Sequence, residues 1–492
     1  MPFVPPNRAM LHRLVSSPVM PVLVSLALGL FRLSGASLWA DEGETYGAAV
    51  HRLQPYEHPV TYFWFMRFWM GAFGSSEFAL RMPSVLSAVG LVFVVYRLAR
   101  YFPIPRLAVW AAWLACLSPF VRLGAQEARM YAPMAFTQST ALWGILAYVN
   151  GHRRGAYLWA AGTAASSALH HLGWFACWPP WLIALIVSRN RRPLIGAGLV
   201  ALGLYAPLFL PTMSQVLLRL QGGHMGSTPS LPAAAKKLFG QAYYMGAGYL
   251  FVRLDGASIR ALASSPLLVI FAGQLMAPAL LAVRGVRRLW ASSRREVFLL
   301  MAFLLPTYLF LAYEGSPANL LLPVFAAYLV PLATGAAVSR APLVIVLLML
   351  WVPALVRQTA VPGYPLHVED WRTMAATIRA QASPEDAVFL TGSRNSIFMT
   401  DYYSVRPATR YALVDSARVH AAFDDHLPRR DPSIVRRVEE TLAHHPRVWL
   451  VYLDWDMPFM ERSVDTLWTS AGRWRQRFGE GLELLRLERS AP

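Results

Sequence analysis

The sequence predicts a polytopic α-helical membrane protein that ends in a soluble α/β domain. Hydrophobic residues make up 56% and charged residues only 15% of the 492 residues, whereas about a quarter of a soluble chain is charged. Apolar runs long enough to cross a bilayer recur up to residue 356 and stop before Gly363. We therefore expect a transmembrane domain at residues 1–356 and a soluble domain at residues 357–492.

Eleven segments are apolar over a length close to the roughly 20 residues that a transmembrane helix needs. Two of them are short and are separated by His170 and His171. If these two formed one long helix, the orientation of everything downstream would be reversed. The eleven expected spans are residues 15–33, 83–98, 107–121, 132–149, 156–169, 173–187, 194–210, 261–283, 297–312, 320–334 and 342–356.

The net charge of +18 comes entirely from residues 1–356, because residues 357–492 contain 18 basic and 18 acidic residues. With the N-terminus inside, the short inner loops hold 16 arginines and a single acid, Glu296, as the positive-inside rule requires. The basic excess therefore indicates membrane topology and not a nucleic-acid partner. We expect a multi-pass protein of the inner (cytoplasmic) membrane, with its C-terminal domain on the periplasmic or extracellular side.

The first apolar run resembles a secretory signal but is longer than the roughly 7–15 residues of a signal-peptide core. We interpret it as an uncleaved first span. The two cysteines, Cys116 and Cys177, both fall inside predicted spans, which does not support a disulfide framework or a cysteine-based zinc site.

The sequence of residues 357–492 predicts a small α/β domain. Helical patterns occur at residues 368–382, 432–445 (after Asp431 as an N-cap) and 464–478. Short apolar runs at residues 387–391 and 447–454 predict buried strands.

Two outer loops are long, residues 34–82 and 211–260, and long structured loops are often functional. The first places Asp41, Glu42 and Glu44 just outside the membrane. If this stretch is helical, Asp41 and Glu44 share one face and Glu42 points elsewhere. A carboxylate at this boundary suits a general base that acts on a lipid-linked substrate. Alternatively the acids cap an interfacial helix, and composition alone favours that interpretation.

Further along the same loop, Glu57 and His58 are candidate metal ligands or phosphate contacts, although a single His beside a proline is more often structural. The aromatic segment 61–73 is too short to span and is expected to lie flat in the membrane interface.

The loop expected at residues 122–131 contains Glu127, Arg129 and Tyr131. The forked guanidinium of Arg129 matches phosphate oxygens and suits a phosphate clamp. The alternative is an ordinary ion pair between Glu127 and Arg129, which contributes less than about 1 kcal/mol when exposed.

Four strings in this order resemble bacterial glycosyltransferase family 39, the protein-mannosyltransferase-like and lipid A aminoarabinose-transferase-like enzymes of the GT-C fold. The resemblance extends over about residues 37–187, including His170-His171, and Asp370-Trp371-Arg372 also resembles this group. The strings are Trp39-x-Asp41-Glu42, Glu57-His58-Pro59, residues 74–84 (GSSEFALRMPS) and residues 126–131 (QEARMY).

The resemblance implies an inverting transferase that uses a polyprenyl-phosphate-linked sugar and passes it to a lipid, glycan or protein acceptor within the membrane environment. It implies Asp41 as the general base, with Glu42 as its neighbour. The motifs indicate no organic cofactor and leave a divalent metal open. The residues expected to bind donor phosphate or acceptor are Glu57, His58, Arg81, Glu127, Arg129, Tyr131, His170 and His171, with Lys236, Lys237 and Arg260 as weaker candidates.

Two departures from the family pattern affect the donor pocket. The aminoarabinose enzymes carry Glu-Lys-Pro where this chain has Glu57-His58-Pro59, so a histidine replaces the lysine expected to touch phosphate. Many relatives have Arg-Tyr ahead of Leu-Leu-Pro, whereas here Asn319-Leu320 stand in that place.

A transporter and a non-catalytic sensor are the alternative functions. A transporter or flippase for a lipid-linked sugar would bury charge near the bilayer midplane and show paired halves, but all acids lie outside the spans. A non-catalytic sensor would not need the acidic motif at the membrane face. Asp454-Trp455-Asp456 resembles the metal-binding Asp-x-Asp motif of nucleotide-sugar transferases, but the domain that contains it is too small to bind a nucleotide sugar in that way. The glycine-rich residues 222–227 lack the lysine of a phosphate-binding loop.

Overall fold

The structure is a computed structural model, and it divides the chain into two units that are described separately below. The first unit comprises Met1–Leu33, Tyr56–Tyr62 and Arg81–Ala360, and the second comprises Ser34–Pro55, Phe63–Leu80 and Val361–Pro492. The described residues are 17–52, 58–221, 240–241, 245, 267–314, 318–339, 347–348, 351–352, 355–356, 358, 360, 369–390, 394–404, 409–412, 440–441, 443–453, 471–478 and 482–489.

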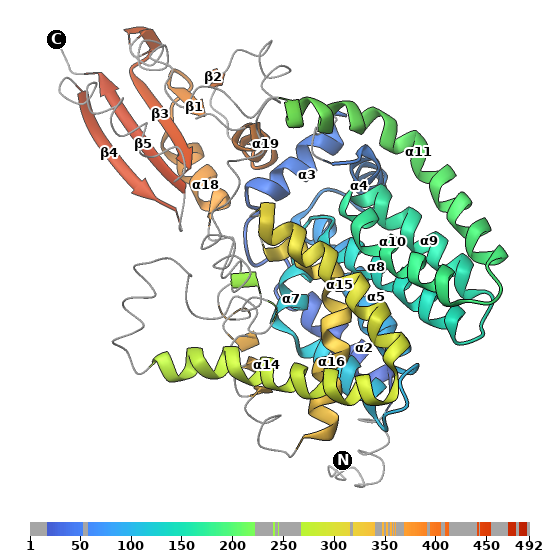
Figure 1. Ribbon diagram of the computed structural model, residues 1–492. Helices are drawn as coiled ribbons and strands as arrows, with labels where there is room; N and C mark the ends of the chain where they lie inside the picture. The colour runs from blue at the N-terminus through green and yellow to red at the C-terminus, as the bar shows by residue number, and fades with distance from the viewer. Residues whose placement is uncertain are drawn as a thin grey trace, which may run out of the picture. The chain divides into compact units, whose positions relative to one another are not determined.

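The first unit is helical (Figure 1). Helices occur at the expected spans from the first to the tenth, and the eleventh, residues 342–356, lies largely outside the described residues. The helices are α2 (Val19–Leu30), α5 (Glu77–Ala99), α6 (Leu107–Leu117), α7 (Pro119–Ala125), α8 (Tyr131–Val149), α9 (Gly155–Leu169), α10 (Leu172–Val187), α11 (Arg192–Gln221), α14 (Leu267–Ser292), α15 (Arg294–Glu314), the 3₁₀ helix η1 (Ala318–Val324) and α16 (Phe325–Val338).

Length and hydropathy single out fewer spans than the eleven expected. Among the described residues, Glu77–Ala99 and Leu320–Val338 are long and apolar enough to cross a membrane, and the bent pair α6 and α7 would make a third. Val19–Leu30, Leu172–Val187 and Arg192–Leu208 are shorter apolar helices. The chain thus has apolar helices of the membrane type, and the number of spans stays a prediction.

Small residues let neighbouring helices approach closely, as is typical of membrane helix pairs. Gly144 in α8 faces the backbone of Trp159 in α9, where an added Cβ would lie 2.4 Å from the Trp159 nitrogen. In α14, a Cβ on Gly285 would lie 1.8 Å from the carbonyl oxygen of Pro331 in α16. Both contacts require glycine, because the backbone of the facing helix leaves no room for a side chain.

The structure confirms the break at the two histidines and corrects a neighbouring prediction. Helix α9 ends at Leu169, His170 is extended, and α10 begins at Leu172. The loop predicted at residues 122–131 is wrong in its first part, because α7 continues to Ala125. The predicted span 107–121 is interrupted at Ser118, whose side chain caps a new helix by accepting a hydrogen bond from the Val121 nitrogen.

The second unit contains the acidic helix α3 (Ala40–His51) and a five-stranded sheet. The strands lie side by side in the order β2-β1-β3-β5-β4 (Figure 1), with β1 parallel to β2 and β3, and β5 antiparallel to β3 and β4. Its elements also include α18 (Trp371–Gln381), β1 (Ala387–Leu390), α19 (Arg394–Tyr402), β2 (Thr409–Ala412), β3 (Arg447–Leu453), β4 (Ala471–Arg477) and β5 (Leu482–Arg489).

Two of the expected strands and one expected helix of this unit are confirmed, as β1, β3 and α18. The helix predicted at residues 464–478 is wrong over its described part, because β4 occupies 471–477 and pairs with β5. The strand pairing places Trp474 and Trp449 on either side of Arg486. The Arg486 guanidinium lies 5.5 Å from the Trp449 ring and 5.6 Å from the Trp474 ring. Most of the helix predicted at 432–445 lies outside the described residues.

The aromatic segment after His58 forms helix α4 (Val60–Phe73), which spans too few residues to cross a bilayer. Trp64, Phe68 and Phe73 are 62%, 76% and 61% exposed, while Phe63 and Met66 are buried. An exposed row of large aromatic side chains is what an interfacial helix presents to lipid. The interfacial location stays a prediction.

Asp386 joins the start of β1 to β3. Its side chain is fully buried and accepts hydrogen bonds from the backbone and hydroxyl of Ser383 at 3.0 and 2.9 Å, from Arg447 at 3.1 Å and from the Trp449 indole at 3.0 Å. Burial alone would raise the pKa of Asp386, but these donors outweigh it and lower the pKa below its ordinary value.

Asp386→Asn is expected to destabilise the sheet by about 2–4 kcal/mol, because an amide NH₂ would face buried donors. Since the folded pKa is the lower one, the stabilisation by Asp386 is fully present above the unfolded pKa of about 3.9 and is lost as the pH falls through the folded value. Faster hydrogen exchange in β1 and β3 at pH 7 would report it. Glu488→Gln, in the half-exposed pair with Arg486, is the control, and equal exchange in both variants would contradict the prediction.

Candidate functional site

The predicted acidic motif forms the start of helix α3 in the second unit. Glu42 is 1% exposed, and its Oε2 accepts a hydrogen bond from the backbone nitrogen of Trp39 at 3.2 Å. Asp41 and Glu44 are half-buried. Glu42 therefore takes the capping role that composition favoured, whereas Asp41 lies on a different face of the same helical turn.

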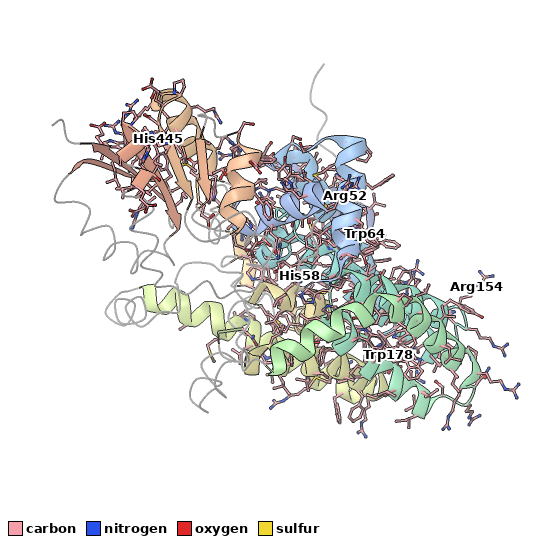
Figure 2. The ribbon with its side chains drawn as sticks, turned by 90° about the horizontal axis from the view of Figure 1, so that it is seen from above. Arg52, His58, Trp64, Arg154, Trp178 and His445 are labelled. Atoms are coloured by element: carbon pink, nitrogen blue, oxygen red, sulfur yellow. The ribbon has the colours of Figure 1, made fainter. Side chains whose placement is uncertain are left out.

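A second cluster, in the first unit, brings together side chains from three separate segments. His58 lies among the helices of this unit (Figure 2), and its Nε2 is 3.4 Å from Nη2 of Arg129. The ring of His58 lies 5.0 Å from the ring of His170. The Arg129 guanidinium lies 5.8 Å from the Tyr131 ring. We call His58, Arg129, Tyr131, His170 and His171 the Arg129 cluster.

The cluster is buried yet polar. Arg129 is 3% and His58 8% exposed, and the carbonyl oxygen of Arg129 accepts a hydrogen bond from Ser84 at 3.2 Å. His171 lies one residue beyond His170, and its Nδ1 is 2.8 Å from the Tyr205 hydroxyl. A guanidinium beside other hydrogen-bonding side chains can bind phosphate oxygens through charge-assisted hydrogen bonds, so this arrangement suits recognition of an anion.

Hydrogen bonds and burial constrain the charges in the cluster. A guanidinium has only donors, so the 3.4 Å contact with Nη2 of Arg129 is a hydrogen bond only when Nε2 of His58 accepts. Nδ1 of His170 accepts from the Leu172 nitrogen at 3.1 Å. Burial, then His171 and Arg129, lower the pKa of His170 to about 3, and burial lowers the pKa of His171 to about 4. Near neutral pH, His170 and His171 are therefore uncharged, and the Arg129 guanidinium keeps its positive charge.

Arg81 and Glu127, the other described candidates of the first unit, are both buried. Arg81 is 3% exposed, and its Nη1 donates to the carbonyl oxygen of Leu33 at 2.9 Å. Glu127 is 1% exposed, in the turn between α7 and α8. Four candidates lie outside the described residues: Glu57, Lys236, Lys237 and Arg260. No group of three or more His, Cys, Asp or Glu side chains that could hold a metal ion occurs in the described parts of the chain.

Two residues that lie at the candidate site were not predicted from the sequence. Tyr205, in α11, is hydrogen-bonded to His171. Glu369 accepts a hydrogen bond from the backbone nitrogen of Ala40, the residue before Asp41. Nothing in the sequence indicated a role for Tyr205, because a tyrosine in an apolar span is usually packed in the core. Glu369 directly precedes the Asp370-Trp371-Arg372 string, and that proximity was the only available indication.

The fold is that of the GT-C glycosyltransferases. ArnT from Cupriavidus metallidurans, in the apo state, matches with a TM-score of 0.60 and 13% identity, over 95% of this chain and 97% of that chain. The same protein bound to undecaprenyl phosphate matches with a TM-score of 0.57 and 14% identity, over 95% and 97%. The oligosaccharyltransferase of Archaeoglobus fulgidus, tethered with an acceptor peptide, matches with a TM-score of 0.54 and 12% identity, over 90% of this chain and 69% of that chain.

A family model also matches the sequence itself. Residues 57–214 match the family described as dolichyl-phosphate-mannose-protein mannosyltransferase. No curated protein matches the chain. The family model and the solved structures that this chain matches are glycosyltransferases, and together they confirm the resemblance inferred from the motifs. The matched residues include the whole Arg129 cluster.

Proposed function

We propose that this protein transfers a sugar from a polyprenyl-phosphate-linked donor to an acceptor at the outer face of the inner membrane, with inversion at the anomeric carbon. The observation that carries the proposal is the Arg129 cluster, in which a buried guanidinium lies beside His58, and His58 in turn lies beside His170. Such a cluster offers one fixed positive charge and several hydrogen-bonding groups to an anionic headgroup.

The reaction requires a base and a stabilised leaving group. Asp41 accepts the proton of the acceptor hydroxyl, and the acceptor oxygen then forms a bond to the anomeric carbon. The bond between that carbon and the phosphate oxygen breaks, and the polyprenyl phosphate leaves with the electron pair. The phosphate thereby gains a negative charge, which Arg129 stabilises through its guanidinium. Arg81, in α5, and Glu127, in the turn between α7 and α8, complete the proposed binding residues.

Two solved structures of the same fold support this donor class. ArnT from Cupriavidus metallidurans was solved bound to undecaprenyl phosphate, and the archaeal oligosaccharyltransferase AglB was solved in complex with an inhibitory peptide and a dolichol-phosphate. Residues 1–356 would form the membrane domain and residues 357–492 the periplasmic or extracellular domain, as the charge distribution predicts.

The test offers purified protein a panel of polyprenyl-phosphate sugars with lipid, glycan and peptide acceptors, and measures release of free polyprenyl phosphate. Transfer from at least one donor is the expected result. The alternative, a flippase, is tested in vesicles that carry the same donors. Translocation of the donor without any sugar transfer would overturn the proposal.

A further inference from the structure

The segment before the acidic helix is held by residues from the far end of the chain, all within the second unit. Nη2 of Arg372 donates to the carbonyl oxygens of Ser34 at 3.0 Å and Ala36 at 3.2 Å. The same side chain forms a two-point ion pair with Glu77, in which Nε donates to Oε1 at 3.3 Å and Nη2 contacts Oε2. A two-point guanidinium–carboxylate pair fixes orientation as well as distance.

Glu369 and Tyr403 hold the residues nearest to α3. The backbone nitrogen of Leu38 donates to the Tyr403 hydroxyl at 2.7 Å. Ser37 Oγ donates to the carbonyl oxygen of Glu369 at 2.6 Å, and the backbone nitrogen of Ala40 donates to Glu369 Oε2 at 3.1 Å. Ala40 is the first residue of α3, so Glu369 satisfies one of the backbone donors that every helix N-terminus leaves open.

These contacts form one connected network. The Tyr403 hydroxyl donates to Glu77 Oε1 while it accepts from Leu38. Burial, then the charge of Glu77, raises the pKa of Tyr403, so the hydroxyl keeps its proton. The Trp371 indole donates to the same Glu369 oxygen at 2.6 Å. Glu77 is buried and Glu369 and Tyr403 are half-buried, whereas Arg372 and Ser34 are exposed. A network whose buried polar groups are hydrogen-bonded favours a single position for the element that it holds.

Helix α3 is also packed along its length against α19. An added Cβ on Gly47 would lie 2.1 Å from Cγ of Phe398, so the helices are in close contact at this point. The Tyr46 and Tyr402 rings meet edge to face with centroids 4.9 Å apart. The helix that carries Asp41 is therefore fixed both at its N-terminus and along one face.

We propose that Glu369, Arg372 and Tyr403 are positioning residues, which hold the N-terminus of α3 so that the Asp41 carboxylate keeps a fixed place. This inference rests on the proposed function, in which Asp41 is the general base. It gives the C-terminal residues a role in the reaction without any contact with substrate. A displacement of a reacting group by about 1 Å can cost about 10²-fold in rate, so the network does not have to touch the reacting atoms to matter.

The test uses the full-length protein with Glu369→Ala, Arg372→Lys and Tyr403→Phe. Each is expected to lower kcat by about 10–100-fold with little change in the KM for the donor, because alignment is lost and donor binding is kept. Glu369→Gln retains a carbonyl oxygen that can accept from Ala40 and is expected to restore most of kcat. A KM rise with unchanged kcat would overturn the positioning role.

Arg477→Lys is the matched control. Arg477 pairs with Glu483 through Nε at 2.9 Å in the β4–β5 hairpin of the same unit, and it is 57% exposed where Arg372 is 44% exposed. It is expected to change kcat by less than about twofold, since exposed pairs contribute under about 1 kcal/mol. An equal fall in Arg372→Lys and Arg477→Lys would indicate general destabilisation and overturn the proposal.

Hydrogen exchange separates this inference from the proposed function. In Tyr403→Phe, the amides of Leu38 to Glu42 are expected to exchange at least about tenfold faster, and those of β1 and β3 to stay unchanged. Unchanged exchange at Leu38 to Glu42 would refute the positioning network even if no donor were ever transferred. Faster exchange together with normal kcat would leave the glycosyltransferase proposal intact and refute the role in alignment.

Discussion

Asp41→Asn is expected to lower kcat by about 10²–10⁴-fold, the usual contribution of a general base, while the KM for the donor stays within about threefold. The amide occupies the same volume and cannot accept the acceptor's proton. Release of polyprenyl phosphate under saturating donor and acceptor measures the change. Helix α3 is expected to stay folded, because Glu42 supplies the cap at Trp39.

The neighbouring carboxylates of α3 provide the controls. Glu44→Gln removes a charge from a half-buried position on the same helix and is expected to keep kcat within about threefold, because Glu44 has no proposed role in the reaction. Glu42→Gln keeps an oxygen for the Trp39 nitrogen and is expected to have a small effect. A normal rate in Asp41→Asn, with protein properly inserted, would exclude Asp41 as the base.

The sequence was most informative where the signal is local. Apolar runs placed the helices, and the polar pair His170-His171 predicted the break between α9 and α10. The ordered strings around Asp41, His58 and Arg129 indicated a resemblance to a glycosyltransferase family, and a mannosyltransferase family model matches residues 57–214. Each of these signals depends on composition or on a short stretch of neighbouring residues, which a single sequence displays directly.

Features that depend on distant partners were not readable. The β4 segment was predicted as a helix, because its pairing with β5 is set by tertiary contact and not by its own pattern. The restart of the helix at Ser118 depends on a single side-chain cap. Glu369 contacts Ala40, which is more than three hundred residues away in the sequence, and no local sequence pattern indicates such a contact.

Arg129→Gln is expected to lower kcat by about 10²–10³-fold, the usual cost of removing one donor that stabilises developing negative charge. The phosphate gains charge as it leaves, so the loss falls mainly on kcat. Arg129→Lys keeps the charge without the planar fork and is expected to recover only part of the rate. Arg122→Lys, at a 4% exposed arginine of α7, is the control and is expected to stay within about threefold.

His58 stands where the aminoarabinose enzymes carry a lysine, and this difference allows a second test of the Arg129 cluster. In this chain His58 Nε2 lies 3.4 Å from Nη2 of Arg129, so His58→Lys alone would place two cations side by side and is expected to be destabilising. Combined with Arg129→Gln, the new lysine restores one positive charge to the cluster, and the double variant is expected to regain at least about tenfold of the lost kcat. If the double variant were as slow as Arg129→Gln while correctly folded, the geometry of the guanidinium would matter rather than its charge. If Arg129→Gln itself transferred sugar at the normal rate, the Arg129 cluster would not be the phosphate site.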